Sequence, residues 1–137
     1  MTHVLEMLIT QPPYALSATA FRFPALASLA GRAPIGGRRE VALAAYLSAR
    51  LIHDALPERG VPAAQRAERA AHAKTWLSTL SLPTPARPAL VGVIEASTGE
   101  RSAMPDAVRK LVATTATFLD AAARSELDAL AVALERA

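Results

Sequence analysis

The apolar residues of this chain are almost all aliphatic, and this limits the folds that it can adopt. Apolar residues make up 52% of the 137 residues, but aromatic residues make up only 4%. A core of Leu, Val, Ile and abundant Ala favours closely packed helices, because Ala is the best helix former and lets helix axes approach. Residues that favour strands are sparse and do not alternate along the chain. We therefore predict an all-α fold.

The last third of the chain has the clearest helical pattern. Apolar residues recur at i, i+3 and i+4 spacing over 105–121, and Pro105 suits the first position of a helix. Ser125 is expected to cap a final helix, which would form an antiparallel hairpin with the 105–121 helix. Upstream, Pro85 and Gly99 delimit another predicted helix. The expected buried stripe of the 105–121 helix consists of Val108, Leu111, Val112, Thr115, Phe118 and Leu119.

Two longer helices are predicted in the middle of the chain. The segment 38–56 has a wide apolar arc, so we expect it to be the central helix, with one polar strip formed by Tyr46, Arg50 and His53. The next helix is expected to run from about Pro62 to Leu80. Its first turns have only Ala as apolar residues, so we expect them to project into solvent or to meet a partner.

The first 37 residues have the least regular pattern. They predict an irregular segment with short helices over 3–10 and from Pro24 to Gly31, followed by a loop to Gly37. Residues 38–137 are expected to form the helical core. Together we predict one domain over 1–137, an irregular and mainly antiparallel bundle of five to six short helices.

The composition also indicates the cellular compartment in which we expect the chain to work. The chain has no Cys, which excludes disulfides and thiolate metal sites and fits a reducing compartment. The first residues lack a cationic secretory pattern, and prolines and charges interrupt every apolar stretch before it reaches membrane-spanning length. We expect a cytoplasmic protein without a membrane partner.

Positive charge is concentrated in the first part of the sequence. The net charge is +3, and residues 1–87 contain 10 basic and 5 acidic residues, whereas 88–137 contain 5 basic and 7 acidic residues. A basic surface can bind nucleic acid or an acidic protein, and it can also be an ordinary solvated face. Nucleic acid is therefore kept as an alternative partner, with a candidate surface formed by Arg59, Arg66, Arg69, Lys74 and Trp76.

The second candidate functional site is an anion-binding site. Arg38 and Arg39 follow two glycines at the start of the central helix, where backbone N–H groups and guanidinium groups can meet an anion, and His53 is grouped with them. The neighbouring Asp54 is expected to pair with Arg50 at i, i+4 spacing. Adjacent residues on a helix diverge by about 100°, so His53 and Asp54 do not form a metal site together.

These observations lead to one functional expectation and two alternatives. No nucleophile and base pattern, metal-ligand spacing or cofactor motif is present, so we expect no catalytic residues, no metal and no cofactor. The leading expectation is a non-catalytic interaction or regulatory protein that binds a protein partner or forms a homodimer. The alternatives are a basic nucleic-acid binder, and a small enzyme or ligand-binding bundle for a phosphate-containing compound.

Overall fold

The computed structural model describes residues 23–32 and 37–136, and this part of the chain is entirely helical or loop, without a strand. The predicted all-α class is thus confirmed, whereas the expected helix over 3–10 lies outside the described residues. The helices are α3 (Pro24–Arg32), α4 (Gly37–His53), α5 (Ala63–Leu77), α6 (Ala86–Ala96), α7 (Met104–Thr115) and α8 (Ala121–Arg136), with 3₁₀ turns η1 (Pro57–Arg59) and η2 (Arg101–Ala103).

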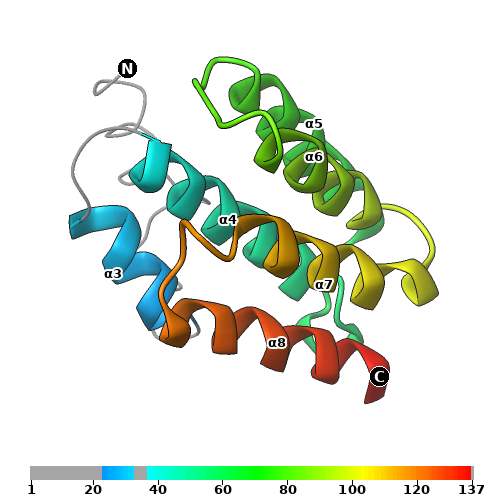
Figure 1. The fold of residues 1–137 in the computed structure, drawn as a ribbon. Coiled ribbons are helices and arrows are strands. Elements are labelled where there is room, and N and C mark those ends of the chain that lie inside the picture. The colour runs from blue at the N-terminus through cyan, green and yellow to red at the C-terminus, as the bar shows by residue number, and fades with distance from the viewer. Residues whose placement is uncertain (1–22, 33–36, 137) are drawn as a thin grey trace.

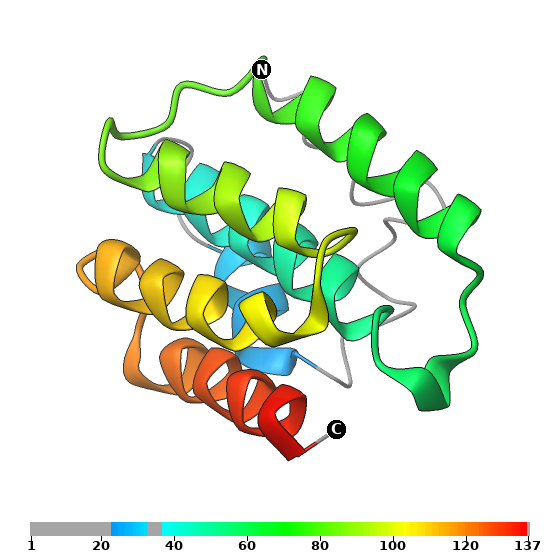
Figure 2. The same cartoon turned by 90° about the vertical axis from the view of Figure 1, so that its right-hand side faces the viewer.

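Helix α4 lies at the centre of the bundle, as predicted (Figure 1). It contacts each of the other described α-helices. The helices from α4 to α8 run in alternating directions, with α5 on one outer edge and α8 on the other (Figure 2). Such an arrangement follows from short connections between neighbouring helices, each of which buries one apolar stripe.

The polar strip that the sequence predicts on α4 is largely covered. Tyr46 is fully buried, and its ring packs edge-on against Phe23 with 6.4 Å between the ring centroids. Arg50 and His53 are partly buried. The sequence pattern could not show this, because the cover includes Phe23, which lies just before α3 and is distant from Tyr46 and His53 in sequence.

Helix α5 is attached to the bundle by a narrow face. Its buried residues are Ala70, Ala73, Trp76 and Leu77, so its first half buries little more than alanine. The first turn at Ala63 is exposed, in agreement with the sequence pattern. The large side chains at the end of the helix therefore provide most of its apolar attachment.

Helices α7 and α8 form the predicted hairpin, but α8 starts earlier than expected. Asp120, not Ser125, occupies the capping position, because its Oδ1 accepts a hydrogen bond of 2.9 Å from the backbone N–H of Ala123. Ser125 is an exposed residue inside the helix. The predicted stripe of α7 is confirmed at Val108 and Leu111, which are 1% and 0% exposed.

Glu126 of α8 joins the last helix to the first described one. Its Oε2 accepts a hydrogen bond of 2.7 Å from the backbone N–H of Ala25, and its Oε1 accepts one of 2.9 Å from that of Leu26. These two N–H groups lie in the first turn of α3, where no helical carbonyl can accept them. A carboxylate at this positive end of the helix dipole is stabilising, so Glu126 caps α3 from about 100 residues away in sequence.

Candidate functional site

Arg38 and Arg39 anchor the start of α4 to its neighbours. The Nε of Arg38 donates to the carbonyl oxygen of Phe118 at 3.3 Å, and the Nε of Arg39 donates to that of Ala30 at 3.1 Å. Arg38 is exposed and Arg39 is partly buried. Each guanidinium group therefore has a backbone acceptor in a neighbouring segment of the bundle, which gives it a packing role.

His53 lies at the other end of α4. Its ring packs edge-on against Phe23, with 5.8 Å between the ring centroids. With a rise of 1.5 Å per residue, roughly 20 Å of helix separates His53 from Arg38 and Arg39. The three residues that the sequence grouped as an anion site are thus not brought together in one place.

A different group of charges meets at the end of α4. Asp54 is only 3% exposed, and its Oδ2 accepts a hydrogen bond of 2.8 Å from Nη1 of Arg69 on α5. Nη2 of Arg59, on η1, lies 3.8 Å from the other carboxylate oxygen. The expected partner Arg50 is close enough to interact electrostatically with Asp54, but the direct salt bridges come from Arg59 and Arg69. We call Arg50, Asp54, Arg59 and Arg69 the arginine cluster.

Arg50 is the least satisfied member of the arginine cluster. Its Nη1 is buried and has no hydrogen-bond acceptor among the described residues. Burial lowers the pKa of Arg50, and the neighbouring Arg69 and Arg59 lower it further, whereas Asp54 raises it. Burial also raises the pKa of Tyr46, which shares a hydrogen bond with Arg50.

The remaining residues of the predicted partner surface lie on α5, and most have partners within the chain. Nη1 of Arg66 donates to the carbonyl oxygen of Ser97 at 3.2 Å, and Lys74 pairs with Glu95 at 3.2 Å. Trp76 is 7% exposed, so it is a core residue rather than an exposed anchor. Basic side chains on α5 thus attach this helix to the segments of α4 and α6. These polar contacts supplement the small apolar face of α5.

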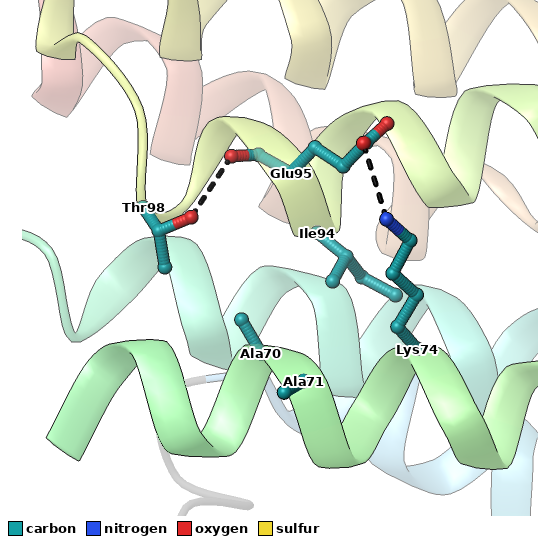
Figure 3. A pocket seen from close by; sticks show the side chains of 6 residues that line it. All are labelled: Ala70, Ala71, Lys74, Ile94, Glu95 and Thr98. Carbon is teal, nitrogen blue, oxygen red and sulfur yellow. Dashed lines mark hydrogen bonds and ion pairs between the residues drawn. The ribbon is translucent and has the colours of Figure 1, made fainter. Parts of the chain in front are cut away.

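An open groove runs between α5 and α6 (Figure 3). Its volume is about 350 Å³. The Lys74–Glu95 ion pair bridges the two helices at this groove, while the small side chains of Ala70 and Ala71 line its α5 side. Its lining consists of Ala70, Ala71, Lys74, Ile94, Glu95 and Thr98.

A second groove, of about 310 Å³, lies between the start of α3, the end of α4 and α8. Two of its lining residues are polar, His53 and Glu126, and Glu126 already accepts both α3 backbone hydrogen bonds. The other lining residues are apolar. The surface of this groove is therefore mainly hydrophobic. The carboxylate of Glu126 at its edge already accepts the hydrogen bonds that cap α3.

The part of the chain that the structure describes contains neither a group of metal ligands nor a membrane-spanning helix. No three His, Cys, Asp or Glu residues within 23–32 and 37–136 are grouped so that they could hold a metal ion. None of the described helices combines the length and the apolar character that crossing a bilayer requires.

The sequence and the fold were compared with known proteins. No protein-family model, no curated protein and no solved structure matches this chain.

Proposed function

We propose that this chain is a non-catalytic interaction module that forms a homodimer through the outer face of α5 and the groove between α5 and α6. The observation that carries the proposal is the surface of α5. This helix lies on an outer edge of the bundle (Figure 2), and it presents exposed alanines to solvent over its first nine residues. These alanines are Ala63, Ala64, Ala67 and Ala71. Small side chains allow another helix to approach closely.

The charges on α5 are compatible with a second copy of the same helix. Arg66, Arg69 and Lys74 all have acceptors within their own subunit. Two copies of this face would therefore meet without strong repulsion between unpaired cations. The same pairing weakens the nucleic-acid alternative, because contacts with phosphate would have to compete with acceptors that these side chains already have.

Large exposed apolar side chains are rare on the described surface outside α5. Val132 on α8 is the only large hydrophobic side chain that is exposed among the described residues, and it is 38% exposed. A stable interface buries about 1,200 Å² or more in total, and one face of a 15-residue helix supplies only part of this area. We therefore expect a dimer that dissociates on dilution rather than a permanent one.

Sedimentation velocity over a wide range of protein concentrations tests the homodimer. We expect a shift from monomer to dimer as the concentration rises. Ala71→Arg places a long charged side chain beside the groove and should abolish this shift, whereas Ala113→Arg, a matched change at an exposed position of α7, should not. A chain that remains monomeric at every concentration, or an equal effect of both variants, would refute the proposal.

A further inference from the structure

A third groove lies between the turn η2, the start of α7 and the end of α8. Its volume is about 360 Å³. Pro105 and Leu134 are buried apolar residues that form part of its wall. The polar residues that line it are Arg101, Ser102, Asp106 and Glu135. None of these residues lines the α5–α6 groove, so a ligand bound here would not depend on dimer formation.

Arg101 has unmet hydrogen-bond donors in the wall of this groove. Its Nε and Nη2 are both buried, and neither has an acceptor among the described residues. The N–H groups of these two atoms lie on one edge of the planar guanidinium group and point in the same direction, a geometry that matches the two oxygens of a carboxylate. A buried charged donor without an acceptor is costly. The side chain would therefore gain most from a ligand that supplies two acceptors side by side.

The guanidinium group of Arg101 can turn toward the groove without losing a hydrogen bond. Arg101 lines the groove and is only partly buried as a residue. Nε and Nη2 make no hydrogen bond where they lie, so a rotation of the side chain breaks none at these two atoms. The gain from a bound carboxylate is therefore not offset by hydrogen bonds lost elsewhere.

The other lining residues favour a monocarboxylate with an apolar tail over a phosphate dianion. Glu135 is held by two hydrogen bonds from Arg109, at 2.8 and 2.6 Å, and Asp106 is an exposed residue at the same groove. Both carboxylates repel a dianion more strongly than a monoanion. Pro105 and Leu134 offer apolar surface to a tail.

We propose that the groove between η2, α7 and α8 binds a small aliphatic carboxylate. Nε and Nη2 of Arg101 donate two parallel hydrogen bonds to the carboxylate oxygens, and the aliphatic tail lies against Pro105 and Leu134. Charge-assisted hydrogen bonds to a carboxylate are about twice as strong as neutral ones, so Arg101 determines the affinity of the site.

An NMR titration of the ¹⁵N-labelled protein with hexanoate, at neutral pH and constant ionic strength, tests this site. We expect saturable shifts of the amide signals of Ser102, Asp106 and Leu134. Hexanol has the same tail length without the carboxylate and should bind about tenfold more weakly or worse. Arg101→Met should weaken hexanoate binding by a similar factor. Lys110→Met removes an exposed positive charge from α7 and should leave the affinity unchanged.

The stability of Arg101→Met without hexanoate separates a ligand-binding arginine from a structural one. The substitution removes the unmet donors and keeps an apolar side chain, so we expect this variant to unfold at a higher urea concentration than the wild type. A lower unfolding midpoint would show that the donors of Arg101 are satisfied within the protein, and it would overturn the proposal. Hexanoate binding no tighter than that of hexanol, or equal effects of Arg101→Met and Lys110→Met, would overturn it as well.

Discussion

Replacing Glu126 by Ala removes both acceptors from the first turn of α3. The carboxylate accepts hydrogen bonds of 2.7 and 2.9 Å from Ala25 and Leu26. Loss of one N-terminal cap typically costs about 1 kcal/mol, and two partly buried acceptors are lost here, so we expect the free energy of unfolding to fall by about 2 kcal/mol. Helix α3 has only nine residues, which is too short for it to persist without tertiary contacts.

Urea denaturation followed by circular dichroism measures this loss, and amide hydrogen exchange locates it. We expect the N–H groups of Ala25 and Leu26 to lose protection in Glu126→Ala. Glu126→Gln keeps one carbonyl acceptor and should lose about half as much free energy, roughly 1 kcal/mol. Glu68→Ala, an exposed change on α5, is the matched control. A loss for Glu126→Ala no larger than that of the control would refute the capping role.

Two further substitutions test local features of the fold. Gly60 has a left-handed backbone with φ of 64° and open space around its Cα, so Gly60→Ala should cost about 1 kcal/mol from backbone strain alone, and Gly60→Asn should cost less in the same urea assay. The hydrogen bond from Arg109 lowers the pKa of Glu135, so the stabilisation from this pair should be complete above the usual pKa of Glu and disappear as the pH falls through the lowered value. An NMR titration should show that the Glu135 pKa rises in Arg109→Ala, and an unchanged pKa would contradict the assignment.

The parts of the fold that depend on local spacing could be predicted from the sequence. The stripe of α7 lies where its i, i+3 and i+4 pattern placed it as far as Thr115, with Leu111 completely buried. The helix ends there, so Phe118 and Leu119, which the pattern assigned to the same helix, lie beyond its end. The start of α8 was predicted too late, because Asp120 was assigned to the preceding helix although its side chain caps the next one. An aspartate can cap the start of a helix or lie on the exposed face of one, and the sequence does not distinguish the two roles. The backbone geometry does.

The candidate site was less predictable because its contacts join separate helices. Local spacing favoured Arg50 as the partner of Asp54, but Arg69, brought to α4 by the packing of α5, makes the short contact. No local pattern singles out Glu126, and its role as an acceptor is evident only from the packing of α3 against α8. The sequence from 50 to 69 contains four arginines and three acidic residues, and this composition does not specify which pairs form.

The position of Glu126 has a consequence for the order in which the chain folds. Neighbouring helices from α4 to α8 can associate soon after they form, because their contacts close only short loops. The contact of α3 with Glu126 joins residues about 100 positions apart, so it has a larger loop-closure entropy than the contacts between consecutive helices. We expect this contact to form after the main folding barrier, so that losing it accelerates unfolding and leaves the folding rate almost unchanged.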